Sequence, residues 1–99
     1  MSSIKEILQE VIAEYEGKAL NGYSYLTRNQ AEDVFSVVSV GEFKGQRIVD
    51  MGLVVRLVDN TIIIERDAND KPLVDALLQA GVPRENIILA YGNESLKTG

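Results

Sequence analysis

The side chains that could do chemistry are concentrated in one polar segment, Glu65-Arg66-Asp67 followed by Asp70 and Lys71. This segment lies between a β-branched run and a pattern typical of a helix, at a kind of junction where functional loops are common. Its carboxylates could bind a hard cation such as Mg²⁺ or act in acid–base catalysis. We favour a solvated turn with helix-capping acids, because negative charge is stabilised at a helix N-terminus without any catalytic role.

The absence of two residue types excludes several kinds of catalytic and metal-binding site. The 99-residue chain has no cysteine and no histidine. Thiolate nucleophiles, disulfides, cysteine-based zinc sites and the commonest general base at neutral pH are therefore absent. We expect a protein that is not an enzyme, with no catalytic residue, no metal ion and no cofactor.

Charge bears on the choice of partner. Fifteen acidic and ten basic side chains give a net charge of −5, and the basic residues are scattered singly along the chain. An acidic protein repels phosphate backbones, so direct nucleic-acid binding is disfavoured. It stays an alternative that would require four cations to gather on one face, namely Arg28, Arg47, Arg56 and Arg66.

Localisation follows from segments that the sequence lacks. No apolar run approaches the roughly 20 residues that span a bilayer. The N-terminus carries Lys5, Glu6 and Glu10 and does not have the pattern of a signal peptide. We expect no membrane insertion and a cytoplasmic location.

Two features indicate a possible binding surface. Arg56 is the one charge in an apolar strand, so its guanidinium must pair with a carboxylate or reach an edge or an interface. We favour pairing with an acid on a neighbouring strand over a role as an interface hot spot. Tyr23 and Tyr25 share a strand face and could stack bases, although packing is the simpler interpretation. The candidate functional surface comprises Arg56, Glu65, Arg66, Asp67 and Tyr25.

Two helices are predicted. The first covers 3–16, with Ser3 and Glu6 as a capping box and a helical stripe formed by Ile4, Ile7, Leu8, Val11, Ile12 and Tyr15. The second begins at Asn69 as its N-cap and runs to about Ala80, where Gly81 ends it.

The remaining segments favour strands, because they are rich in β-branched and aromatic residues. Residues 41–45 are predicted to form a hairpin loop, and Asp59-Asn60 a two-residue turn. The expected strands are Tyr23 to Thr27, Val34 to Val40, Arg47 to Val58, Thr61 to Arg66 and Asn86 to Tyr91.

The predicted fold is therefore a single α+β domain over residues 1–99, with a polar tail from about residue 92. It has an N-terminal helix, an antiparallel β-meander, a second helix and a final strand, with both helices on one face of the sheet. The strand from Leu53 to Val58 is apolar on both faces, and two short helices cover only one. We therefore expect a homodimer, with Arg56 near its interface.

The C-terminal segment, NTIIIERDANDKPLVDALLQAGVPRENIILAY from Asn60 to Tyr91, resembles the signature region of the XisI-like family. The family consists of fdxN element excision controlling factors, found mainly in cyanobacteria. Its pattern has a strand ending in a polar pair, a capped helix, a Gly-Val-Pro turn and a short strand closing on an aromatic residue. The hairpin from Val38 to Val49 is also similar, so about two-thirds of the chain carries the resemblance.

Departures from that pattern imply a divergent member. Family members usually have a Trp near the hairpin turn, a second Trp in the strand before the polar pair and a His in the long strand. The corresponding places here hold Glu42 or Phe43, the run Ile62 to Ile64, and Arg56 or a neighbour. The resemblance implies a regulatory protein that binds a companion excision factor with a nuclease-like fold. The alternative is an accessory factor that binds DNA directly and positions a site-specific recombinase.

Overall fold

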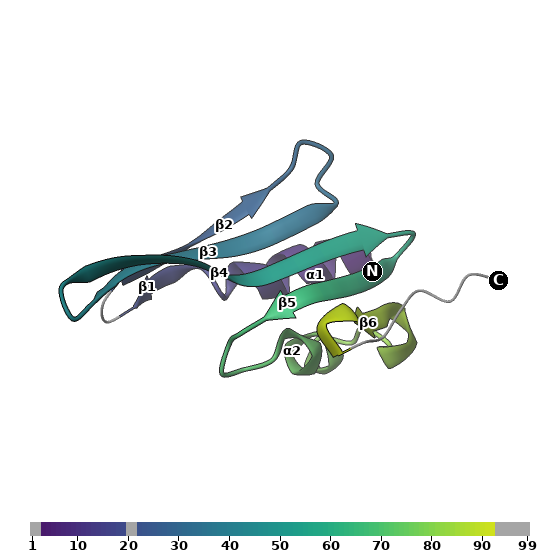
Figure 1. The fold of residues 1–99 in the computed structure, drawn as a ribbon. Coiled ribbons are helices and arrows are strands. Elements are labelled where there is room, and N and C mark those ends of the chain that lie inside the picture. Colours follow the sequence, from purple (N-terminus) through teal and green to yellow (C-terminus); the bar gives the residue numbers. More distant parts are fainter. Residues whose placement is uncertain (1–2, 20–21, 93–99) are drawn as a thin grey trace.

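The computed structural model describes residues 3–19 and 22–92. The chain forms one six-stranded sheet in the order β1-β2-β3-β4-β5-β6, with two α-helices (Figure 1). The elements are α1 (Ile4–Ala13), β1 (Gly17–Ala19), β2 (Gly22–Arg28), β3 (Val34–Phe43), β4 (Gln46–Val58), β5 (Thr61–Asp67), α2 (Leu73–Gln79), η1 (Arg84–Asn86), β6 (Ile87–Leu89) and η2 (Ala90–Gly92). The predicted α+β fold class is confirmed.

Helix α1 begins where the sequence predicts. The Ser3 side chain accepts a hydrogen bond from the Glu6 amide, and the Glu6 carboxylate accepts one from the Ser3 amide, which is a complete capping box. Leu8, Val11 and Ile12 form its buried stripe. Capping fixes the first turn, and the stripe fixes the face that the helix turns to the sheet.

The long hairpin of β3 and β4 closes on a turn shorter than the predicted loop. Lys44 and Gly45 both have positive φ, 53° and 77°, as a type I′ turn requires. The strands therefore continue to Phe43 on one side and restart at Gln46 on the other. Asp59 and Asn60 form the second tight turn, with φ of 48° and 64°, as predicted.

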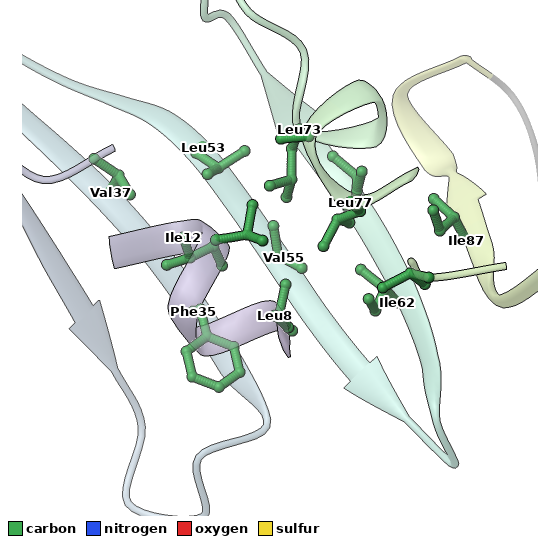
Figure 2. Close-up of a cluster of buried hydrophobic side chains, with 14 residues drawn as sticks. Leu8, Ile12, Phe35, Val37, Leu53, Val55, Ile62, Leu73, Leu77 and Ile87 are labelled. Carbon is green, nitrogen blue, oxygen red and sulfur yellow. The ribbon is translucent and has the colours of Figure 1, made fainter. Parts of the chain in front are cut away.

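The core lies between the two helices and one face of the sheet, which we call the inner face (Figure 2). Alternate residues of the strands point into it, because side chains alternate across a strand. The fully buried members include Leu8 and Ile12 from α1, Phe35, Leu53, Val55, Ile62 and Ile64 from the sheet, and Leu73 and Leu77 from α2. Both helices thus cover the same face, as expected.

The structure differs from the predicted elements at the start of the second helix, in the final strand and in one additional strand. Helix α2 starts at Leu73 rather than after Asn69, because Pro72 holds an extended conformation with φ of −62° and ψ of 139°. The final strand is limited to Ile87–Leu89 and runs parallel to β5, with 3₁₀ turns on both sides. The short strand β1 is missing from the prediction, and the predicted polar tail after residue 92 lies outside the described residues.

The β3–β4 hairpin is longer than its neighbours and extends past both helices (Figure 1). A register shift between Val37 and Val38 leaves Gly52 as an extra residue on β4. Pairing between β4 and β5 begins only at Leu53. We call the part of the hairpin beyond this shift, Val38–Met51, the arm. It contributes to the elongated shape, with extents of 50 × 30 × 27 Å.

One edge of the sheet carries a side-chain hydrogen bond in place of a strand. Among the described residues, strand β2 has no strand partner on this side beyond its short pairing with β1, and the Leu26 amide on β2 donates to Oε2 of Glu16 at 2.8 Å. A carboxylate on an edge amide blocks pairing with another strand.

Within the described residues, no helix is long and apolar enough to cross a membrane.

Substitution of a buried residue and of an exposed residue on the same strand should change the free energy of unfolding by very different amounts. Leu53 is fully buried, whereas Val49 on the arm is 62 % exposed. We expect Leu53→Ala to lower the free energy of unfolding by about 3 kcal/mol, through lost burial and the cavity left behind. Val49→Ala should change it by less than about 0.5 kcal/mol. Urea denaturation followed by circular dichroism measures both, and equal effects would contradict the assignment of faces.

Candidate functional site

The most exposed apolar surface lies on the outer face of β2 and the arm, opposite the core. Cross-strand pairing places Tyr25, Val38 and Met51 in one row and Tyr23, Val40 and Val49 in the next. Four of these side chains are large and exposed: Tyr23, Tyr25, Val49 and Met51. We call these six residues the outer patch. Its exposed side chains leave on the order of 400 Å² of mainly apolar surface, as large as the functional patches of typical monomers.

The two tyrosines of the outer patch contact each other. The ring centroids of Tyr23 and Tyr25 are 4.6 Å apart with the planes inclined by 40°. Tyr25 is 49 % exposed. The two rings therefore pack against each other along strand β2, but both remain exposed to solvent. Exposed aromatic rings of this kind are typical anchors of protein interfaces.

The inner side of the arm also exposes apolar side chains, because the helices do not reach it. Ile48 and Phe43 are both exposed, and the Lys44 ammonium lies 5.5 Å from the centroid of the Phe43 ring. A shallow hollow of about 390 Å³ lies here, lined by residues that include Gly41, Phe43, Ile48 and Asp50. In the part of the chain that the structure describes, the arm therefore has exposed apolar side chains on both of its faces.

Arg56 pairs with an acid on the neighbouring strand, as favoured from the sequence. Its Nε donates to Oε2 of Glu65 at 2.7 Å. The register shift between Val54 and Val55 makes Glu65 an extra residue on β5. Both side chains are substantially exposed, so the pair adds little to stability. Nearby Ile63, which pairs across the strands with Arg56 and Ile88, is buried.

Arg66 marks the point where strand pairing stops. Its Nε donates to the Met51 carbonyl at 2.6 Å, and Nη2 lies 3.5 Å from Oδ1 of Asp50. The guanidinium thus binds the Met51 carbonyl, whereas the Gly52 carbonyl next to it accepts from the Ala68 amide. Two of the four arginines that direct DNA binding would require are therefore held in ion pairs with Glu65 and Asp50.

Asp67 organises the turn between β5 and α2. Its Oδ2 accepts from the Leu73 amide at 2.6 Å, and its Oδ1 accepts from the Asn69 amide at 3.0 Å. Pro72 at the N-cap has no side-chain oxygen, so Asp67 caps the helix from six residues upstream. Asn69, predicted as the N-cap, donates instead to Asp67 and to the Gly52 carbonyl.

The acidic segment does not form one centre. Glu65 faces Arg56, Asp67 holds main-chain amides, and Asp70 is an exposed residue of the following turn. Among residues 3–19 and 22–92, no three Asp, Glu, His or Cys side chains come together closely enough to hold a metal ion. In the acidic segment, the Glu65 carboxylate forms an ion pair with Arg56, and the Asp67 carboxylate caps helix α2.

Tyr15 joins α1 to the turn before α2. Its hydroxyl donates to the Lys71 carbonyl at 2.8 Å. Burial, together with the negative charges of Asp67, Glu14 and Asp75, raises the pKa of Tyr15 to about 12. The neutral phenol is thus the form that the fold retains.

Sequence reasoning included Tyr25 in the candidate surface but favoured packing for it, and it missed the residues that lie beside it, above all Val49 and Met51. The signal available was length, because the fourth strand runs to 13 residues beside a fifth strand of 7. The longer strand extends beyond the shorter one, and within the described residues its pairing with β5 begins only at Leu53.

The fold and this surface define a small α+β domain whose main feature is an exposed apolar arm beside a separately covered core. The chain belongs to the XisI family, because the family model described as XisI protein matches residues 1–98.

Two solved structures from Anabaena variabilis ATCC 29413 share the fold. The fdxN element excision controlling factor XisI is 23 % identical, with a TM-score of 0.65 over 88 % of each chain. A XisI-like protein is 22 % identical, with a TM-score of 0.64 over 87 % of this chain and 78 % of that one. The search of curated proteins gave no match. The expected family and its divergent character are confirmed.

Removal of the Asp67 carboxylate should leave amides of the β5–α2 turn without an acceptor. We expect Asp67→Ala to lower the free energy of unfolding by about 2 kcal/mol, through lost helix capping and unpaired amides. Asp67→Asn keeps one oxygen acceptor and should lose less. Denaturant titration at neutral pH measures both, and an unaffected Asp67→Ala variant would show that the carboxylate does not anchor the turn.

The raised pKa of Tyr15 predicts a loss of stability at high pH. Unfolded tyrosine ionises near pH 10, whereas folded Tyr15 ionises near 12. Its contribution is therefore full below pH 10 and falls as the pH rises from 10 to 12. At pH 8 we expect Tyr15→Phe to be less stable by about 1 kcal/mol, through the lost hydrogen bond. The gap should narrow between pH 10 and 12, and a constant gap would contradict the assignment.

Proposed function

We propose that this protein is a non-catalytic regulatory subunit that binds a companion excision factor in a system that excises a DNA element. The observation that carries the proposal is the outer patch, a set of exposed tyrosine and aliphatic side chains on a rigid sheet. Membership of the XisI family supplies the biological setting, since one structural relative is an fdxN element excision controlling factor.

The composition of the outer patch suits a protein partner. Tyrosine and methionine are enriched at the centres of protein interfaces, where charged residues are depleted. The patch has two exposed tyrosines, Met51 and Val49, and no charged member. A β-sheet platform also keeps these side chains in place before binding, which lowers the entropic cost of association.

The charge of the whole chain favours the same kind of partner. At −5, the protein attracts a basic surface and repels nucleic acid. A companion that acts on DNA needs a basic face, and an acidic subunit bound beside that face would restrain its contact with DNA. Electrostatic attraction would raise the rate of encounter, while the outer patch would supply the buried contact.

Substitution of Tyr25, the more exposed of the two tyrosines, tests the proposed contact. We expect Tyr25→Ser to weaken capture of the purified companion factor by roughly 30-fold or more, as truncation of an aromatic hot spot does. Leu78→Ser is the matched control, because Leu78 is similarly exposed but lies on α2. Isothermal titration calorimetry measures both affinities.

Equal binding by wild type and Tyr25→Ser would remove the outer patch from the contact. A gel shift at low salt tests the DNA alternative, because electrostatic binding is strongest there. We expect no shift at micromolar protein, and a clear shift by the chain alone would overturn the proposal in favour of direct DNA binding.

A further inference from the structure

The arm leaves one side of β4 open. On one side β4 pairs with β3 over its full length, but on the other side its pairing with β5 begins at Leu53. Within the described part of the chain, no strand lies against residues 46–51 on that side, and the Gly52 carbonyl accepts from the Ala68 amide at 2.8 Å. An open strand edge offers unpaired main-chain donors and acceptors to another strand.

The turn at Lys44-Gly45 determines which main-chain groups face this edge. In a two-residue hairpin the flanking residues, here Phe43 and Gln46, form a hydrogen-bonded pair, and the pattern then alternates along the ladder. The amides and carbonyls of Arg47, Val49 and Met51 therefore point away from β3. The bond from Arg66 to the Met51 carbonyl agrees with this direction and occupies the last of these acceptors.

The open edge of β4 is not protected in the way that the β2 edge is. Proteins commonly guard an edge with a proline, an inward charge or a covering loop. The β2 edge has such a guard in Glu16, whose carboxylate accepts from the Leu26 amide. On β4 the open stretch contains the adjacent apolar residues Ile48 and Val49, which face opposite sides and are both exposed.

The formal charge of the arm favours a second copy of this chain as the partner at the open β4 edge. The arm holds two acids, Glu42 and Asp50, and two bases, Lys44 and Arg47, so its formal charge is zero within a chain of −5. A neutral, mixed-sign segment does not repel a second copy of itself. Two-fold symmetry also turns one strand antiparallel to its own copy, so a single open edge is complementary to itself.

We propose that two copies of this protein pair edge to edge through β4, with the two-fold axis at Ile48. In this register Arg47 of one copy lies opposite Val49 of the other, which completes about four main-chain hydrogen bonds. The two Ile48 side chains meet on the inner face, and Gln46 lies opposite Asp50. The Met51 carbonyl stays with Arg66.

Other registers fit less well. A shift that centres the axis on Val49 would set Ile48 opposite Asp50, so an apolar side chain would face a carboxylate. It would also call on the Met51 carbonyl, which already accepts from Arg66. The pairing centred on Ile48 joins the two sheets and brings the two outer patches onto one continuous surface.

Proline substitution tests the edge without disturbing the hairpin. The Val49 amide points away from β3, so Val49→Pro removes a donor that the fold does not use. Because of the symmetry each dimer loses two hydrogen bonds, and we expect its dissociation constant to rise on the order of 100-fold. Val49→Ala keeps the amide and should stay dimeric. Analytical ultracentrifugation measures both, with circular dichroism to verify the fold.

A monomeric wild type at tens of micromolar, or a folded Val49→Pro variant that dimerises as well as wild type, would overturn the proposal. The register has its own test, because the chain has no native cysteine. Ile48→Cys should form a disulfide-linked dimer under mild oxidation, since directly opposed residues of a non-hydrogen-bonded pair lie roughly 4.5 Å apart. Val49→Cys should link much more slowly, because its two copies lie diagonally at roughly 8 Å.

Faster linkage of Val49→Cys would exclude the register. The result is separable from the proposed binding of a companion factor through Arg47→Pro, because the Arg47 amide faces the same open edge and Arg47 is not a member of the outer patch. Calorimetry of this variant with the companion reports on that function alone.

Discussion

Two short helices provide the apolar cover for one face of a sheet that is much longer than they are. The ten residues of α1 span about 15 Å, whereas the thirteen residues of β4 span about 43 Å. Burial of inner-face residues such as Phe35 and Leu53 against the helices holds the fold together, and it is limited to the part of the sheet that they reach. Beyond Gly52 the strands keep their ladder but lose their cover. The exposed tyrosines, the uncovered arm and the open edge all follow from this difference in length.

Local signals made much of this architecture predictable. The capping box of Ser3 and Glu6, the helical stripe of α1 and the turn at Asp59-Asn60 each depend on residues within a few positions of one another. Arg56 was expected to find an acid on a neighbouring strand, and Glu65 is that acid. The resemblance carried by residues 60–91 extended these local signals to a family, which the family model confirms.

The failures have a common physical origin, because each depends on contacts between segments that are distant in sequence or on backbone geometry that propensity does not describe. Asn69 has the residue type of a good N-cap, yet the Gly52 carbonyl and Asp67 bind its amide, and Pro72 takes the cap position. The strand β1 has only three residues and exists through its pairing with β2. The outer patch needed the register between β2, β3 and β4, which no single segment reveals.

The hydrogen bond from the Leu26 amide to Glu16 has a consequence for the size of any assembly built from strand edges. A protein with two competent edges is divalent and can add copies without end, as fibres do. With the Leu26 amide held by the Glu16 carboxylate, the β2 edge is guarded against adding a further strand at that point. A copy joined at β4 therefore does not offer this part of β2 for the next addition, so that a single acid 10 residues away from its partner in sequence limits the growth of the assembly.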